Sequence, residues 1–182
     1  MKARVLALAS AAAVALSGLA AFGAHAALET GVAAPDFTAQ AYLAGKPFTF
    51  NLNAALKKGP VVVYFFPAAY TPGCQIEAHL FAEAADQFKA KNATIIGVTA
   101  GKTEELQKFS EDTLYCSGKF PMALDKDLAI AKSYQSAMAE RPLSNRISYV
   151  IGKDHKVALA YSNANPNDHV TQTMAAVTKL SK

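Results

Sequence analysis

The sequence predicts a single α/β domain with a central mixed β-sheet flanked by helices on both faces. Three observations indicate this fold class. Strand-like and helix-like segments alternate along residues 27–182, a pattern typical of α/β domains. The segment at 61–66 is apolar without a polar break, as a strand covered on both faces should be. Hydrophobic residues make up 52% of the chain, which is enough for a core without disulfide bonds.

The first elements of the domain are short. Residues 34–37 (APDF) are expected to be extended, because a residue before proline avoids the helical region. Residues 48–52 alternate between apolar and polar and predict a short strand. A helical turn is expected over 52–58, ended by the Gly-Pro pair at 59–60. The strongest predicted strand, 61–66, follows directly.

A helix is predicted over residues 74–89, after a loop that closes with Pro72 and Gly73. Apolar residues recur at helical spacing along it, namely Ile76, Leu80, Phe81, Ala84 and Phe88. In sheets of this kind, ligands bind where the carboxyl ends of strands meet the starts of helices. Cys74 lies at such a point.

The remaining segments continue the alternation. Strands are predicted at 94–99 and 120–124, helices at 103–110, 127–134 and 168–180, and two further strands at 147–151 and 157–161. The last two strands are joined by a short charged turn and are expected to form an antiparallel hairpin. With the earlier elements, this order predicts the mixed sheet.

Residues 1–26 have the pattern of a signal peptide. Lys2 and Arg4 precede a largely Ala-rich apolar stretch, and Ala24-His25-Ala26 has the small-x-small pattern of a cleavage site. A membrane-spanning anchor is the alternative, since the length allows one. Cleavage near Ala26 is favoured because alanine is weakly apolar and no positive cluster follows. We therefore expect a mature domain over 27–182, periplasmic or otherwise exported.

The net charge of +4 is modest, and Lys2 and Arg4 contribute two of these charges. The chain contains no basic stripe and no long run of one charge. We therefore expect neither nucleic acid nor, after cleavage, a membrane as a partner.

Cys74 is the main candidate for chemistry. The nucleophilic form of cysteine is the thiolate, and a position at the start of a helix places the sulfur near unpaired N–H groups and the positive end of the helix dipole. Arg146 begins a strand that can pair with the strand preceding Cys74, so its cation can approach the sulfur. Thr71 can offer a hydroxyl, and Pro67 can shield the thiolate from water.

Residues 67–74 read PAAYTPGC, which is P-x-x-x-T-x-x-C directly after an apolar strand. This pattern resembles the active-site signature of the peroxiredoxins of the AhpC/TSA family. The longer match over 62–77, with the opening at 34–37 and the strand after Arg146, is similar to the Q-type branch, also called the bacterioferritin-comigratory-protein group. The resemblance covers nearly all of residues 27–182.

The resemblance implies a thioredoxin-like fold and a thiol-dependent peroxidase that needs no metal, flavin or haem. Cys74 matches the peroxidatic cysteine, Thr71 and Pro67 match the residues that bind and shield the peroxide, and Arg146 matches the activating arginine. Glu77 matches a position that is usually acidic and orients the arginine. The implied partners are a peroxide and a thioredoxin-like or other dithiol reductant, and the implied assembly is a monomer or a weak homodimer.

The chain departs from the Q-type pattern at the second cysteine. Many members carry it five residues after the first, where this sequence has His79. We expect His79 to be an exposed or half-packed helix residue. The other cysteine is Cys116, which we expect to resolve oxidised Cys74 after local unwinding. A permanent Cys74–Cys116 disulfide and an uninvolved Cys116, with an external thiol as resolver, are the alternatives.

Other functions remain as alternatives. A thiol-disulfide oxidoreductase normally needs C-x-x-C, and residues 74–77 read CQIE. A copper-binding assembly protein on the same fold would need paired soft ligands, and neither the cysteines nor His79, His155 and His169 have such spacing. The third alternative is an exported, non-catalytic binding module with a structural disulfide. Only the combination of residues in the motif around Cys74 argues against it.

Overall fold

The computed structural model describes residues 27–181. The predicted signal peptide at 1–26 lies outside these residues. The strands are β1 Thr38–Leu43, β2 Lys46–Asn51, β3 Val61–Phe65, β4 Thr94–Thr99, β5 Met122–Leu124, β6 Ile147–Ile151 and β7 Val157–Ser162. The helices are α1 Leu52–Leu56, α2 Pro72–Ala90, α3 Leu106–Glu111 after a 3₁₀ turn at Thr103–Glu105, α4 Ala129–Ser133 and α5 His169–Leu180.

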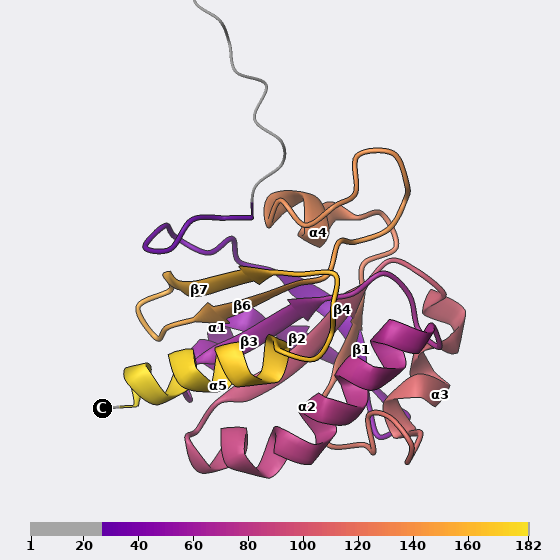
Figure 1. Cartoon of the computed structure of the whole chain (residues 1–182), viewed down its shortest axis with the longest axis horizontal. Helices are drawn as coiled ribbons and strands as arrows, with labels where there is room; N and C mark the ends of the chain where they lie inside the picture. The colour runs from indigo at the N-terminus through magenta and orange to yellow at the C-terminus, as the bar shows by residue number, and fades with distance from the viewer. Residues whose placement is uncertain (1–26, 182) are drawn as a thin grey trace, which may run out of the picture.

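The strands form one seven-stranded mixed sheet in the order β2-β1-β5-β4-β3-β6-β7 (Figure 1). β3 and β4 are parallel, as are β4 and β5, whereas β6 runs antiparallel to β3 and to β7. The predicted mixed sheet and the predicted hairpin are therefore confirmed. Within residues 27–181, no helix combines the length and the apolar character that a membrane crossing needs.

The sheet separates two apolar clusters, and β3 supplies both. Alternate residues of this strand point to opposite faces, so Val62 and Tyr64 pack with α2, α3 and α5, while Val61 and Val63 pack with α1 and the α4 region. All five residues of β3 are buried, as the unbroken apolar run predicts. In Figure 1, α2 and α5 lie side by side on one face.

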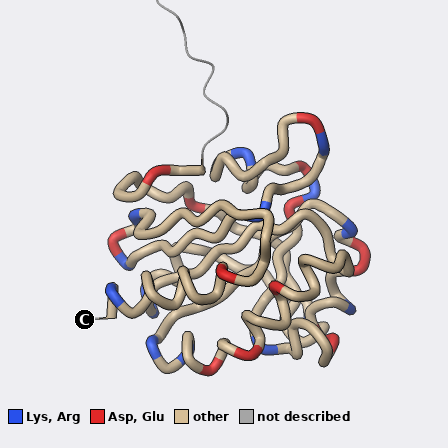
Figure 2. Tube along the Cα trace, viewed as in Figure 1, with Lys and Arg blue, Asp and Glu red and all other residues tan. Residues whose placement is uncertain are grey.

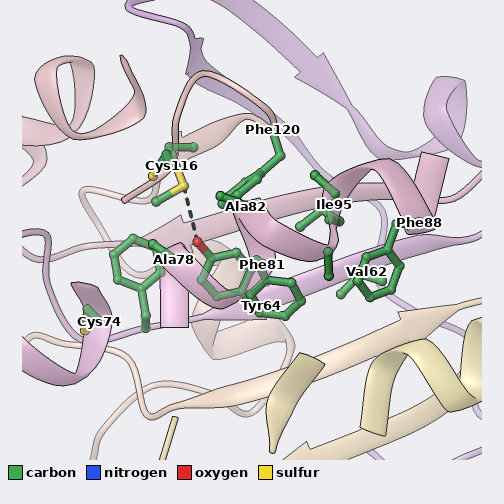
Figure 3. Packing of buried hydrophobic residues seen from close by; sticks show 14 of the residues in the cluster. Val62, Tyr64, Cys74, Ala78, Phe81, Ala82, Phe88, Ile95, Cys116 and Phe120 are labelled. Carbon is green, nitrogen blue, oxygen red and sulfur yellow. Dashed lines mark hydrogen bonds between the residues drawn. The ribbon is translucent and has the colours of Figure 1, made fainter. Parts of the chain in front are cut away.

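The cluster around α2 is rich in aromatic rings (Figure 3). Phe81 of α2 stacks on Tyr64 with ring centroids 4.6 Å apart. The buried Tyr64 hydroxyl has Met122 Sδ as its partner at 3.5 Å, so a polar group in this core is not left unpaired. This packing holds α2 on the sheet and thereby helps to position its first turn, which carries Cys74.

The sequence prediction differs from the structure in two informative places. Strand β1 was not predicted, because its inward residues include Ala39 and Ala41, and alanine has low strand propensity. It pairs with β2 through a two-residue turn in which Ala44 and Gly45 both have positive φ, as tight hairpin turns require. The second difference is that α2 begins at Pro72, two residues earlier than predicted.

Charged residues of both signs are spread around the periphery of the tube in Figure 2, and neither sign gathers on one element. This agrees with the absence of a basic stripe in the sequence.

Candidate active site

Cys74 occupies the third position of α2. Pro72 is the first helical residue and Thr71 the extended residue before it, with φ −95° and ψ 148°. Proline suits this first position because its missing N–H would be unpaired anyway and its φ is already helical. The Cys74 side chain is 1% exposed. The sulfur is therefore enclosed in the first turn of a long helix, beside N–H groups that lack helical partners.

The loop between β3 and α2 is held by hydrogen bonds at both ends. The Thr71 hydroxyl donates to the Ala68 carbonyl at 3.1 Å. The Pro67 carbonyl accepts from the Thr99 hydroxyl, also at 3.1 Å. Ala68 forms a bridge with Gly101, and a side chain at Gly101 would collide with the Pro67 carbonyl. Pro67 and Thr71 are thus placed in a loop that has little freedom.

Arg146 reaches Cys74 because of strand pairing. β6 lies beside β3 with Ile147 opposite Phe65, so the residue before β6 lies at the end of β3 where the loop begins. The predicted neighbour relation is confirmed. Arg146 Nη2 lies 3.5 Å from Cys74 Sγ. A Cβ at Gly73 would come within 2.9 Å of this nitrogen, so the glycine permits the approach.

The guanidinium of Arg146 has two further partners. Nε donates to the Ala164 carbonyl at 3.0 Å, and Nη1 donates to Glu77 Oε2. The ion pair is largely buried, with side-chain exposures of 8% for Arg146 and 0% for Glu77. Because these partners hold Nε and Nη1, the planar guanidinium has a fixed orientation in which Nη2 faces Cys74.

Glu77 lies one helical turn after Cys74 and faces the same way. Burial raises the pKa of its carboxyl to about 8, although the Arg146 charge and hydrogen bond act in the opposite direction. Its second oxygen, Oε1, has no hydrogen-bond partner among the described residues. His169 Nδ1 lies 3.5 Å from this oxygen.

His169 is a site neighbour that no sequence pattern indicated. It is the first residue of α5 and is fully buried. In the sequence, it precedes the apolar positions of that helix without a spacing that suggests a ligand or a base. Its place beside Glu77 results from the packing of α5 on α2, which only the folded chain provides.

Cys116 lies in the loop between α3 and β5 and is fully buried. Both cysteines are free thiols. They belong to the same apolar cluster, as Figure 3 shows. Burial raises the pKa of the Cys116 thiol far above its ordinary value, and the Asp112 charge adds to this effect. The folded state therefore suppresses the thiolate of Cys116.

The loop that carries Cys116 contacts residues on either side of Cys74 in the sequence. The Tyr70 hydroxyl donates to Asp112 Oδ2 at 3.1 Å, and the Tyr70 ring lies edge-on to Tyr115. His79 Nδ1 lies 3.1 Å from the Leu114 carbonyl. His79 is exposed, as the sequence predicts, and it contacts the loop that carries the second cysteine.

Comparisons with known proteins identify the family of this chain. Residues 30–160 match the model of the AhpC/TSA family. The chain is 33% identical over 128 residues to the putative peroxiredoxin bcp of Helicobacter pylori, covering 70% of this chain and 74% of that protein. It is 31% identical over 152 residues to the chloroplastic peroxiredoxin Q of Populus jackii, covering 82% and 68%.

A solved structure is similar as well. The peroxidoxin BcpB of Mycobacterium tuberculosis superposes with a TM-score of 0.75 and 26% identity, covering 84% of this chain and 98% of that one. The fold is therefore the thioredoxin-like fold of the peroxiredoxins, as predicted. The family match, the relatives and the fold agree that the chain belongs to the AhpC/TSA family and is a peroxiredoxin, a thiol-dependent peroxidase.

Proposed function

We propose that Cys74 is the peroxidatic cysteine and that Arg146, Thr71, Pro67 and Glu77 form its active site. The observation that carries this proposal is the 3.5 Å contact between Arg146 Nη2 and Cys74 Sγ at the start of α2. The thiolate is the reactive form of cysteine, and a buried cation and the positive end of a helix dipole both lie beside this sulfur.

The reaction follows from this arrangement. The Cys74 thiolate attacks the terminal oxygen of ROOH, the O–O bond breaks, and sulfenic acid forms while RO⁻ leaves and takes up a proton. The sulfur loses two electrons and the peroxide gains them. Arg146 and the Cys74 N–H would stabilise the charge that develops on the oxygens, and Pro67 would limit the access of water. The Thr71 hydroxyl would join them by turning its proton from the Ala68 carbonyl toward the peroxide.

The surface beside the loop supports a substrate range that includes organic hydroperoxides. A hollow next to the start of α2 is lined mainly by apolar side chains, among them Pro72, Ile76, Leu80, Leu114 and Tyr115. Ile76 and Leu114 are exposed at 47% and 66%. An alkyl group of a hydroperoxide could rest there, whereas hydrogen peroxide needs no such surface.

Cys116 is the resolving cysteine in this proposal. Its thiol would condense with the Cys74 sulfenic acid to give a disulfide and water, and an external dithiol of the thioredoxin type would then reduce the disulfide. Because both sulfurs are buried and burial suppresses the Cys116 thiolate, the Cys116 loop and the start of α2 must open first. The Tyr70–Asp112 hydrogen bond joins these two segments and would restrain that opening.

We also propose that the enzyme works outside the cytoplasm. The support is the charge, apolar stretch and cleavage pattern of residues 1–26. An exported thioredoxin-like protein is then the natural reductant, since the cytosolic one would lie across a membrane.

Replacing Cys74 should abolish peroxide consumption. Purified Cys74→Ser, supplied with hydrogen peroxide or an alkyl hydroperoxide and a dithiol, is expected to leave the peroxide unconsumed because no other thiolate is accessible. Cys116→Ser is the matched control and should still consume one equivalent in a first turnover. A ferric xylenol orange assay measures both, and retained activity in Cys74→Ser would refute the assignment.

Peroxide should produce an intramolecular Cys74–Cys116 disulfide, detected by mass spectrometry of peptides. Tyr70→Phe should form it faster, by roughly five-fold, because a hydrogen bond worth about 1 kcal/mol no longer restrains opening. Tyr42→Phe is the control, since the Tyr42 hydroxyl makes no hydrogen bond within residues 27–181. If only sulfenic acid accumulates, Cys116 is not the resolver and an external thiol takes that role.

The full chain expressed in a bacterium should be recovered in the periplasm with Ala27 as its first residue. N-terminal sequencing and intact mass measure this directly. Protein that retains Met1 and sediments with membranes would show that residues 1–26 are an anchor.

The stability contribution of Glu77 should decline as pH rises. Its pKa is raised from 4.5 to about 8 in the folded state. Below pH 4.5, the carboxyl is therefore protonated in both the folded and the unfolded chain. Between 4.5 and 8 the unfolded chain ionises while the folded one stays protonated, and the folded state loses stability. The free energy of unfolding of the wild type, relative to Glu77→Gln, should therefore be lower at pH 8 than at pH 5.

Urea unfolding at the two pH values tests this expectation. Glu140→Gln provides the control, since Glu140 is exposed. A difference for Glu77→Gln that grows with pH would mean that the Arg146 pair, rather than burial, dominates the titration.

A further inference from the structure

Both ring nitrogens of His169 have partners, and these partners define its protonation. Nε2 lies 2.9 Å from the Asn163 carbonyl. Because a carbonyl only accepts, Nε2 carries a proton. Nδ1 lies 2.8 Å from the Ser148 hydroxyl, which can donate to it in the neutral ring. The geometry therefore suits a neutral imidazole with its proton on Nε2.

The surroundings of His169 favour this neutral form. The groups that face it are Glu77 from α2, Arg146 before β6, Tyr161 from β7 with its ring 4.8 Å away, and Asp168 just before it. Burial lowers the pKa of the imidazole, while the bond to Asn163 opposes this. Since His169 is fully buried, burial disfavours the positively charged form of the ring.

The two groups that hold Arg146 are both in contact with His169. One is Glu77, whose Oε2 binds Arg146 Nη1 and whose Oε1 faces His169 Nδ1 at 3.5 Å. The other is the turn at 163–164. Its Ala164 carbonyl binds Arg146 Nε, its Asn163 carbonyl binds His169 Nε2, and its Asn163 N–H binds the Arg146 carbonyl at 3.3 Å.

We propose that His169 is a positioning residue for Arg146: in its neutral form its Nε2 proton holds the 163–164 turn and its Nδ1 edge packs against Glu77 without a hydrogen bond, and this arrangement directs Nη2 at the Cys74 sulfur. This inference rests on the proposed function, since it assumes that Arg146 activates Cys74 toward peroxide. His169 touches neither the sulfur nor the peroxide in this scheme, and it transfers no proton in the reaction.

The two contacts of His169 can be removed separately. In His169→Asn, the amide lies near the former Nδ1 and retains a polar group toward Ser148 and Glu77, but the donor to Asn163 is lost. In His169→Gln, a donor can reach the Asn163 carbonyl, but the group facing Glu77 is lost. His169→Leu removes both contacts at similar volume. His155→Gln, at an exposed turn position, is the control.

The experiment compares two reactions of Cys74 in reduced protein that also carries Cys116→Ser, so that a single thiol is present. One is the second-order reaction with hydrogen peroxide, and the other is alkylation by iodoacetamide. Alkylation needs the thiolate but has no oxygen charge for Arg146 to stabilise, whereas the peroxide reaction needs both. A misdirected guanidinium should therefore lower the peroxide rate more than the alkylation rate.

We expect His169→Leu to slow the peroxide reaction on the order of 10-fold or more, with a smaller fall in alkylation, and the Asn and Gln variants to lie between it and the wild type. In the Glu77→Gln background the loss should be less than additive, because the two residues act through one guanidinium. If His169→Leu does not fold, the Asn and Gln variants still decide the question.

Two results would overturn the inference while leaving the peroxidase intact. One is an unchanged peroxide rate in the His169 variants that fold. The other is an equal fall of both rates, which indicates a loosened helix start and no specific effect on Arg146. A wild-type protein whose Cys74 is alkylated normally but does not react with peroxide would instead refute the proposed function, and the inference with it.

Discussion

The proposed active site depends on a buried guanidinium, whose N–H groups need acceptors. Removing one partner from a buried ion pair leaves an uncompensated charge, which is strongly destabilising. Arg146 satisfies this constraint with Glu77 on α2, the Ala164 carbonyl after β7 and Cys74 at the start of α2. These acceptors come from separate segments, so the contact with the sulfur exists only when β6, α2 and the turn before α5 are packed together.

Close approach of the backbone is the second constraint on the site. Gly73 lies where a side chain would meet Arg146, and Gly101 lies where one would meet the Pro67 carbonyl. The apolar run of β3 fills both faces of the sheet and leaves the loop after it rigidly supported. A well-packed core therefore supports the loop that carries Pro67 and leads to Cys74.

Both thiols are buried and free in the folded protein. Cys74 and Cys116 share one apolar cluster, but their segments are joined by the Tyr70–Asp112 bond and by His79 against the Leu114 carbonyl. In the proposed reaction, resolution through Cys116 would require local opening, and the contacts between these two segments would set its free energy. His79, which contacts the Leu114 carbonyl, stands where many Q-type members carry a second cysteine.

Local patterns of apolar spacing and turn chemistry in the sequence were enough to predict the α/β class, the buried central strand, the hairpin and the motif around Cys74. The sequence also indicated that Arg146 could reach the sulfur, because the apolar runs at 61–66 and 147–151 both predict strands that can pair. It did not indicate β1, whose inward residues include alanines, or the role of Pro72 as the first helical residue. Only the tertiary structure brought His169 to Glu77 and joined the Cys116 loop to Tyr70, because these contacts depend on the packing of segments far apart in the chain, which no local pattern encodes.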